Sequence, residues 1–270
     1  MSDTSTSSAP GGAALITGAS TGIGAVYADR LAKRGHDLIL VARDEARLNA
    51  LAERLRGETG VKVEVIKADL TDKADLVKLE QRLAADTAIT VLVNNAGVAG
   101  AGDFVGSEPD AFEKMIQLNV VAVTRLASAA ARNFVPRNAG TIINLASVVG
   151  LMPELNMPVY GATKAYVTYL TQALRAQFGD SAVRLQAVLP GATRTEIWER
   201  SGSDINAMDP NMVMDVDDMV DAALAGFDQG ELVTIPSLPD AADWTHALAA
   251  KAKLYPNLSR SQPAARFKTA

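Results

Sequence analysis

The sequence predicts an α/β fold, in which a doubly wound parallel sheet of about seven strands is flanked by helices. Short apolar runs alternate with longer amphipathic segments, a pattern typical of repeated strand–helix units joined by right-handed crossovers. Apolar residues make up 48% of the 270 residues, which suits a sheet that is buried on both faces. This length is enough for one large domain.

The expected elements follow one another regularly from the N-terminus. Apolar runs of strand length lie at residues 13–17, 37–42, 61–67, 89–94, 141–145, 184–189 and 231–235. Helical patterns lie between them at residues 22–34, 44–56, 72–85, 110–135, 159–178 and 216–227. Ligands of such sheets bind beyond the carboxyl ends of the strands, so the segments that follow the strands are expected to form the site.

The first strand leads into a glycine-rich turn and then into a helix. The segment reads Leu15-Ile-Thr-Gly18-Ala-Ser20-Thr21-Gly22-Ile23-Gly24. Glycines let the backbone turn sharply and let a pyrophosphate approach the amides at a helix N-terminus. The spacing differs from the commoner Gly-x-Gly-x-x-Gly fingerprint. The segment predicts a Rossmann-type dinucleotide site; the alternative is a tight turn that binds no ligand.

A second signature joins Ser147 to the run Tyr160-Gly-Ala-Thr-Lys164. Residues four apart share one face of a helix, so the Tyr160 hydroxyl and the Lys164 ammonium are expected to point into one space. A nearby positive charge favours the phenolate, and a hydroxyl at Ser147 can hold a carbonyl oxygen. Taken alone, a Tyr-x-x-x-Lys pair also recurs by chance on exposed helices, and Ser147 alone suits a turn.

Together these segments resemble the classical short-chain dehydrogenase/reductase family, from about residue 13 to about residue 195. Two further runs match the family, Asn94-Asn95-Ala96-Gly97 and Pro190-Gly191, and Asn119 falls where the family places a catalytic asparagine. The resemblance implies a single Rossmann-fold domain and hydride transfer between a nicotinamide and a carbonyl group.

The resemblance also implies four catalytic residues. Tyr160 would be the acid/base, and Ser147 would hold the reacting oxygen. Lys164 would lower the pKa of Tyr160 and bind the nicotinamide ribose, and Asn119 would anchor a water that links Lys164 to solvent. The alternative for Asn119 is a helix-interior side chain that bonds to the backbone.

Arg43, directly after the strand at 37–42, indicates which cofactor is used. An NAD site wants a carboxylate there for the ribose 2′-hydroxyl, whereas a guanidinium suits the 2′-phosphate of NADP(H) by charge and geometry. NADP(H) is therefore expected, and NAD(H) is less favoured. Asp44 is the competing candidate for NAD, although its simpler role is the N-cap of the next helix. The alternative for Arg43 is a solvated strand end.

The remaining cofactor contacts are implied by the resemblance alone. Asp69 would accept from the adenine amino group, unless it caps the next helix together with Thr71. Thr195 would help to hold the carboxamide of the nicotinamide. The full set expected to bind the cofactor is Gly18, Ser20, Thr21, Gly22, Ile23, Gly24, Arg43, Asp69, Leu70, Asn94, Asn95, Ala96, Gly97, Pro190, Gly191, Thr193 and Thr195.

The substrate is expected to be a small molecule, and its pocket to be apolar. Candidate lining residues are Val149, Leu151, Met152 and Trp198, which could equally be core or subunit contacts. Residues 192–215 are expected to form a lid over the substrate; a plain surface loop is the alternative. An apolar ketone or aldehyde fits best, and the enzyme would reduce it to an alcohol or form it from that alcohol in the reverse reaction. A 3-oxoacyl substrate on a carrier or on CoA, and a non-catalytic NADP(H) sensor, are the other possibilities.

Composition excludes several classes of function. The net charge of −5 and the absence of a basic cluster argue against nucleic acid as a partner. Cysteine is absent and the histidines, His36 and His246, stand far apart, so no metal site is expected. No apolar run reaches the length of about 18 residues that a membrane span needs. A cytoplasmic protein is the default expectation.

The expected organisation is a disordered tail at 1–10, one domain at 11–256, and a C-terminal tail at 257–270. Members of the family are dimers or tetramers, so a homodimer or homotetramer is expected, built on the helices at 110–135 and 159–178. A face of small residues in the first helix would allow close packing between subunits, or on the chain's own sheet; it is made of Ala122, Ala127, Ala130 and Ala131.

Overall fold

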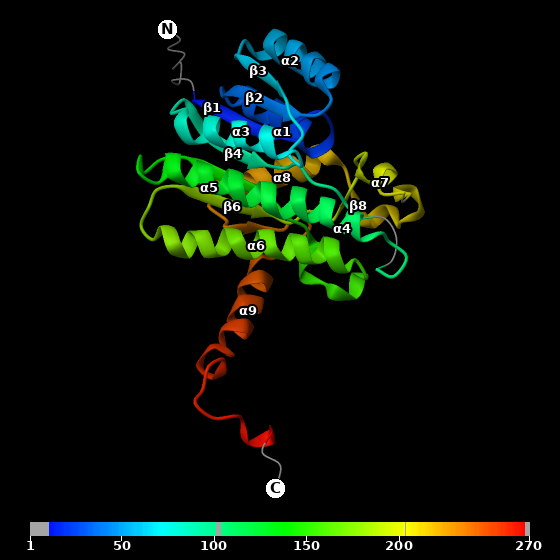
Figure 1. The fold of residues 1–270 in the computed structure, drawn as a ribbon, viewed down its shortest axis with the longest axis vertical. Coiled ribbons are helices and arrows are strands. Elements are labelled where there is room, and N and C mark those ends of the chain that lie inside the picture. Colours follow the sequence, from blue (N-terminus) through cyan, green and yellow to red (C-terminus); the bar gives the residue numbers. More distant parts are fainter. Residues whose placement is uncertain (1–10, 101–103, 203, 268–270) are drawn as a thin grey trace, which may run out of the picture. The chain divides into compact units, whose positions relative to one another are not determined.

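In the computed structural model of the protein, residues 11–100, 104–202 and 204–267 are described. Their main sheet has seven parallel strands in the order β3-β2-β1-β4-β5-β6-β9 (Figure 1). The strands are β1 (Ala13–Thr17), β2 (Asp37–Ala42), β3 (Val63–Lys67), β4 (Ile89–Asn94), β5 (Thr141–Leu145), β6 (Arg184–Val188) and β9 (Val233–Thr234). The order reverses direction between β1 and β4, as in a doubly wound sheet.

Helices cover both faces of this sheet. The helices described up to residue 236 are α1 (Gly22–Lys33), α2 (Glu45–Thr59), α3 (Lys73–Ala85), α4 (Pro109–Ile116), α5 (Val123–Phe134), α6 (Pro158–Phe178), α7 (Ile197–Arg200) and α8 (Val216–Asp228). One core layer joins the sheet to α1, α2 and α8, and a second joins it to α3 and α5. Alternate residues of β1 divide between the layers, since Ala14 and Ile16 belong to the first and Leu15 to the second. The fold predicted from the sequence is confirmed.

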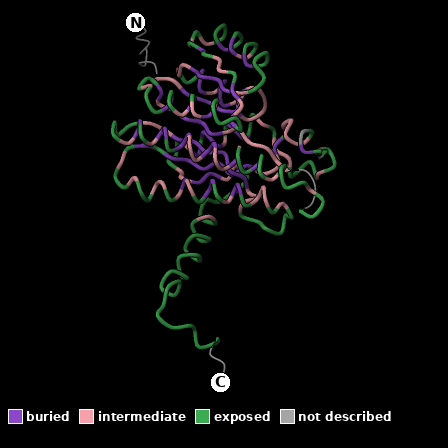
Figure 2. Tube along the Cα trace, viewed as in Figure 1, coloured by how far each residue is buried: buried purple, intermediate pink, exposed green. Residues whose placement is uncertain are grey.

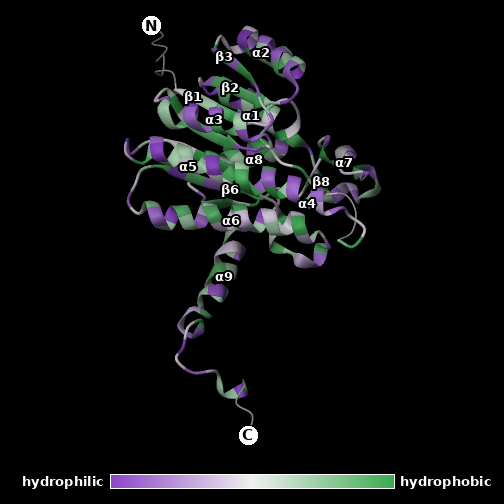
Figure 3. Ribbon diagram, viewed as in Figure 1, coloured by the Kyte–Doolittle hydropathy of each residue, from purple (hydrophilic) through white to green (hydrophobic). Residues whose placement is uncertain are grey.

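Buried residues concentrate in the strands and on the inner faces of the helices (Figure 2). The same central strands are the most hydrophobic part of the ribbon (Figure 3). No helix in the described part of the chain combines the length and the apolar character that a membrane span requires.

The predicted strand bounds differ from the structure by one or two residues, at the edge strands β3 and β9 and at β6 beside β9. Strands β3 and β9 start two residues later than predicted, and β6 and β9 each end one residue earlier. The larger difference is in the helix predicted at 110–135. It is divided into α4, a π-helical segment η1 (Gln117–Ala122), and α5. A π-turn has no recognisable hydrophobic period in sequence, so the interruption could not be seen there.

Contacts divide the chain after Pro236 into two compact units. The second unit, residues 237–270, contains α9 (Ala241–Ala252) and short 3₁₀ turns at Tyr255–Asn257 and Ala265–Phe267. The sequence predicted no helix there. The expected tail at 1–10 lies outside the described residues, and the expected domain limit at residue 256 stays a prediction.

Helix α1 is tied to α2 through one nearly buried carboxylate, that of Asp29. It accepts hydrogen bonds from Lys33 (2.7 Å), Arg30 (2.8 Å) and Arg54 of α2 (3.0 Å). Arg30 also pairs with Asp217 and Asp221 of α8, at 2.7 Å each. Burial works to raise the pKa of Asp29, but the hydrogen bonds outweigh it and lower the pKa to about 2. The ionised carboxylate therefore stabilises the packing of these helices.

We predict that Asp29→Asn lowers the free energy of unfolding at pH 7 by about 2 kcal/mol, because a carboxyl whose pKa is lowered on folding stabilises the protein above its unfolded pKa. That contribution fades as the pH falls from about 4 towards 2, so the wild type and the variant should converge there. Urea unfolding at a series of pH values measures the difference. Asp180→Asn, at an exposed position, is the control; a difference that does not depend on pH would contradict the account.

Candidate active site

The predicted site residues meet along one edge of the sheet. Because the seven strands are parallel, their carboxyl ends lie on the same side. The glycine turn follows β1 and Arg43 follows β2, while Asp69 comes two residues after β3. The run from Asn95 to Gly97 follows β4, Ser147 comes after β5, and the run from Pro190 comes after β6. Segments that are far apart in sequence thus form a continuous rim.

The glycine turn is built as a cradle in which side chains have no room. Gly18 has φ 65°, and a Cβ on it would lie 2.9 Å from the Cα of Ala96. A Cβ on Gly24 would lie 2.4 Å from the Gly18 carbonyl oxygen. Thr21, the N-cap of α1, makes no side-chain cap hydrogen bond. The first amides of α1 are therefore left to a ligand or to solvent, and this arrangement fits a pyrophosphate.

Asn95 and Ala96 hold the turn in place. The Asn95 side-chain amide donates to the carbonyl oxygens of Thr17 (2.9 Å) and Gly18 (3.2 Å). The Thr17 hydroxyl accepts from the backbone amides of Asn95 and Ala96, at 3.0 Å each. These contacts join the ends of β1 and β4. Thr17 is not among the residues predicted for the site, because a threonine at a strand end has no distinctive pattern in sequence.

Asn94 lies beneath the rim and is only 2% exposed. Its side-chain amide donates to the Asn144 side chain (2.9 Å), and that of Asn144 donates to the Thr171 hydroxyl of α6 (2.9 Å). This buried line of polar groups ties β4, β5 and α6 together. Asn144 and Thr171 were also missed from the sequence, because each looks like an isolated polar residue in an apolar element.

Arg43 and Asp69 face each other across the ends of β2 and β3. The Arg43 guanidinium is 71% exposed, and its nearest nitrogen lies 4.0 Å from an Asp69 carboxylate oxygen. The other Asp69 oxygen accepts from the Thr71 amide (2.9 Å) and hydroxyl (2.7 Å). Burial acts to raise the pKa of Asp69, but these hydrogen bonds and Arg43 outweigh it and lower the pKa. The accessible guanidinium is available to bind an anion.

Asp44 has the simpler of its two expected roles. It is the N-cap of α2 and accepts from the Arg47 amide at 3.0 Å. Its carboxylate is thus used within the protein, which weakens the competing case for NAD.

Asn119 is positioned by the π-helical segment η1. It is 1% exposed. Its side-chain oxygen accepts from the Val98 amide (3.0 Å), while its nitrogen donates to the Val98 carbonyl (2.9 Å) and the Thr163 hydroxyl (3.2 Å). The bonds to Val98 fix the segment that follows β4, and the bond to Thr163 reaches the helix that carries Tyr160 and Lys164.

Ser147, Tyr160 and Lys164 come together at the start of α6. Ser147 is buried, donates weakly to the Pro190 carbonyl (3.4 Å) and accepts from the Val149 amide (3.2 Å). The Lys164 ammonium donates to the Leu145 carbonyl (2.8 Å) and lies 5.7 Å from the centre of the Tyr160 ring. The face shared by Tyr160 and Lys164, predicted from their spacing, is thus present.

The two titratable groups of this trio are shifted by burial. Burial raises the pKa of the Tyr160 phenol, and its hydrogen bond with the Ser147 side chain acts in the opposite direction. Burial lowers the pKa of Lys164 to about 8. We expected Lys164 to lower the pKa of Tyr160, but loss of solvation has the larger effect on the phenol here. A phenol that keeps its proton at neutral pH is suited to act as an acid.

Part of the segment 192–215 folds back over the rim. Strands β7 (Ala192–Thr193) and β8 (Val213–Met214) pair with each other, and the Trp198 indole donates to the Thr193 carbonyl at 2.8 Å. The Arg47 guanidinium pairs with Glu196 at 2.8 Å, which links the segment to α2. Thr195 lies against the glycine turn, since a Cβ on Gly22 would lie 3.2 Å from its methyl group.

Three of the residues expected to contact substrate follow Ser147 closely in the chain, and Trp198 lies in α7. Val149 and Leu151 belong to a 3₁₀ turn capped by Ser147, and Met152 follows it. Val149 and Trp198 are partly exposed, while Leu151 is 37% and Met152 49% exposed. None of the four belongs to the buried core, which excludes a core-packing role and leaves substrate or subunit contacts. Among the described residues no cluster of three or more acidic, histidine or cysteine side chains is placed to hold a metal.

The chain belongs to the short chain dehydrogenase family, whose model matches residues 12–206. It is similar to a solved short-chain dehydrogenase from Sphingobium yanoikuyae in complex with NADPH. The identity is 52% and the TM-score 0.93, over 95% of this chain and all of that one. It is also similar to the bulky-bulky ketone specific alcohol dehydrogenase from Comamonas testosteroni. There the identity is 46% and the TM-score 0.89, over 96% of this chain and 99% of that one.

A more distant relative is the very-long-chain 3-oxoacyl-CoA reductase of Anas platyrhynchos. It is 31% identical over 188 residues, which make up 68% of this chain and 60% of that reductase. The match therefore spans less than two thirds of that relative's length. The family assignment confirms the resemblance inferred from the motifs and makes the protein an oxidoreductase.

We predict that Gly24→Ala destabilises the protein by about 1–3 kcal/mol, because its methyl group would collide with the Gly18 carbonyl and the Asn95 amide. Gly57→Ala is the matched control. Gly57 lies in the last turn of α2 and a Cβ there would meet nothing within 4 Å, so alanine should be neutral or stabilise by up to about 1 kcal/mol. Urea unfolding of both variants tests this prediction. Equal changes in the free energy of unfolding would show that the turn can accommodate a methyl group at Gly24.

Proposed function

We propose that the protein is an NADP(H)-dependent carbonyl reductase that acts on ketones with two bulky substituents, and on the corresponding alcohols in reverse. The observation that carries this is the convergence of Ser147, Tyr160 and Lys164 on the same rim as the glycine cradle and the exposed Arg43. The Sphingobium relative in complex with NADPH and the ketone-specific relative from Comamonas support the cofactor and the substrate class.

The cradle and Arg43 would hold the two ends of the adenosine diphosphate part of the cofactor. The uncapped first turn of α1 would bind the pyrophosphate, and Arg43 the 2′-phosphate. Ile23 would lie in that first turn, Ser20 and Thr21 in the loop, and Leu70 and Gly97 along the adenosine. Pro190, Gly191, Thr193 and Thr195 would lie along the nicotinamide. When bound, NADPH supplies the hydride that reduces the carbonyl carbon.

The protein's own side chains would handle the oxygen and its proton. Ser147 would donate to the carbonyl oxygen and stabilise the negative charge that develops there. Tyr160 would donate its proton to that oxygen, and its raised pKa keeps the proton available at neutral pH. Lys164, held by the Leu145 carbonyl, would supply positive charge beside the phenol. Asn119 would hold the water that returns a proton towards Lys164.

The substrate pocket would be formed by Val149, Leu151, Met152 and Trp198, under the segment 192–215 as a lid. These side chains are apolar; Val149 and Trp198 are partly exposed, and Leu151 and Met152 are exposed. An apolar lining of this kind suits apolar groups on both sides of a carbonyl. A 3-oxoacyl-CoA substrate is the second candidate, supported by the name of the relative from Anas platyrhynchos.

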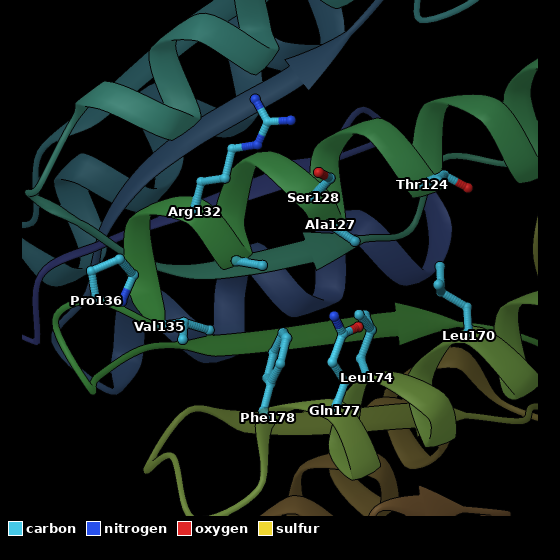
Figure 4. Close-up of a pocket in the computed structure, with 11 residues that line it drawn as sticks. Thr124, Ala127, Ser128, Arg132, Val135, Pro136, Leu170, Leu174, Gln177 and Phe178 are labelled. Atoms are coloured by element: carbon cyan, nitrogen blue, oxygen red, sulfur yellow. The ribbon is translucent and has the colours of Figure 1, made fainter.

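We also propose that the protein forms a homodimer or homotetramer in the cytoplasm, with α5 and α6 at a subunit interface. These helices border an apolar groove of about 480 Å³, shown in Figure 4. Ala127 and Ala131 line it, whereas Ala122 and Ala130 are buried in the core layer of the sheet. Two residues of the expected small-residue face therefore line the groove, and the other two pack against the chain's own sheet. The groove lies along the later turns of α6, away from Tyr160 and Lys164 near its start.

We predict that Arg43→Asp weakens NADPH binding by about 10- to 100-fold, because it removes a charge-assisted hydrogen bond and adds repulsion. Binding of NADH should be unchanged or tighter. Fluorescence titration of both nucleotides measures this. Lys78→Asp, which changes the net charge equally on the exposed face of α3, is the control and should keep the preference of the wild type. Equal weakening in both variants would contradict a direct contact.

We predict that Tyr160→Phe lowers kcat for ketone reduction by about 10²- to 10⁴-fold, the usual contribution of a positioned acid. Binding of NADPH should change little. The assay follows NADPH consumption with an aryl alkyl ketone whose substituents are both larger than methyl, and with a 3-oxoacyl-CoA. Tyr169→Phe, an exposed tyrosine on the same helix, should keep full activity. A variant that retained wild-type turnover would remove Tyr160 from the mechanism.

A further inference from the structure

Two glycines let the short turn that follows Ser147 rest directly on the backbone of α6. The turn is the 3₁₀ segment η2 (Val148–Leu151), and Ser147 is its N-cap. A Cβ on Gly150 of this turn would lie 2.6 Å from the Ala165 nitrogen and 2.8 Å from the Lys164 carbonyl carbon of α6. Both are backbone atoms, so no rotation of a side chain could make room for a larger residue at this position.

The second glycine makes the same contact from the side of the helix. Gly161 lies in α6, directly after Tyr160. A Cβ on Gly161 would lie 3.1 Å from the Val149 carbonyl oxygen of η2 and 3.5 Å from a Val149 methyl group. Such an approach is tighter than nearly all real Cβ contacts, so η2 would have to withdraw by a few tenths of an ångström. The turn and the helix therefore meet backbone to backbone at both glycines.

Neither glycine is needed for the conformation of its own backbone. Gly18 and Gly22 have positive φ, but Gly150 and Gly161 do not, so their backbone does not call for glycine. A glycine within a helix is in fact destabilising relative to alanine. What these two positions require is the lack of a side chain, where η2 meets α6.

The contact between η2 and α6 fixes the place of Ser147. The Ser147 carbonyl accepts from the Gly150 amide (3.1 Å), and its hydroxyl accepts from the Val149 amide (3.2 Å). Because of these two bonds, a displacement of the turn carries Ser147 with it. The Ser147 hydroxyl also shares a hydrogen bond with the Tyr160 phenol of α6. Withdrawal of η2 from the helix would thus separate the two hydroxyl groups.

We propose that Gly150 and Gly161 are positioning residues for carbonyl reduction, which keep η2 seated on α6 and so hold the Ser147 hydroxyl and the Tyr160 phenol at the separation that one carbonyl oxygen requires. This inference rests on the proposed function. Groups that act together on one atom must be held within about 0.5 Å, and a misplacement of about 1 Å costs about 100-fold in rate. The two glycines act through the placement of Ser147.

Gly161→Ala is the most informative variant, because catalysis and stability should respond to it differently. The gain in helix propensity offsets the tight contact, so the urea midpoint and NADPH binding should stay near the wild-type values. The value of kcat for ketone reduction should fall by about 5- to 50-fold. Gly150→Ala meets backbone atoms and should lower both kcat and stability. Gly57→Ala, in the last turn of α2 with nothing within 4 Å, is the matched control and should keep the wild-type kcat.

A double-mutant cycle with Ser147→Ala shows whether the loss acts through Ser147. In a chain that lacks this hydroxyl, Gly161→Ala should lower kcat by no more than about twofold, because residues that act as a unit are not additive. The full loss in that background would overturn the proposal, as would a wild-type kcat in Gly161→Ala. A change confined to the KM for the ketone would also overturn it, since that result would assign the glycine to the substrate pocket.

Failure of the proposed function would look different. A wild type that binds NADPH but reduces no ketone would overturn both the activity and this role for the glycines. An active wild type with equally active glycine variants would overturn the role of the glycines alone. Circular dichroism checks that each variant is folded, and Gly161→Ala decides the matter if Gly150→Ala does not fold.

Discussion

The parallel direction of the seven strands is the constraint on which the site depends. Every strand of the main sheet runs the same way, so each strand delivers the residues after it to one edge. The glycine turn, Arg43, Asp69, Asn95 and Ser147 come from five different strand ends. An antiparallel partner would send its following loop to the opposite edge. The placement of the functional side chains at one edge therefore depends on the backbone hydrogen bonds that pair the strands in parallel.

Buried polar contacts hold this edge at a fixed spacing. The Thr17 hydroxyl joins the ends of β1 and β4, and the line from Asn94 through Asn144 to Thr171 joins β4, β5 and α6. Hydrogen bonds between buried groups are costly to leave unmade, so these residues fix one arrangement of strands and helix. Their effect is to keep α6, with Tyr160 and Lys164, against the strand that leads to Ser147.

Much of the fold and of the motif residues could be predicted, because both depend on local pattern. Apolar runs located β1, β2, β4 and β5 to the residue, and the four-residue spacing of Tyr160 and Lys164 predicted their shared face. The interruption of the helix at Gln117–Ala122 could not be predicted, since a π-turn depends on what surrounds it. Asn144 and the Arg47–Glu196 pair join distant parts of the chain, and a single sequence holds no signal for such partners. The direction of the Tyr160 pKa shift depends on burial, which only the folded chain reveals.

We expect NADPH held at this rim to transfer a hydride to a ketone carbon while the protein supplies the proton. This is tested most directly by incubating the protein with a bulky ketone and NADPH deuterated at nicotinamide C4, with one face labelled in a first reaction and the other face in a second, and measuring the mass of the product alcohol by mass spectrometry. The expected product of one of the two reactions is an alcohol that carries one deuterium on its carbinol carbon and a hydroxyl proton that exchanges with water. Nucleotide bound without any alcohol formed, or an alcohol that contains no deuterium from either face of the cofactor, would contradict it.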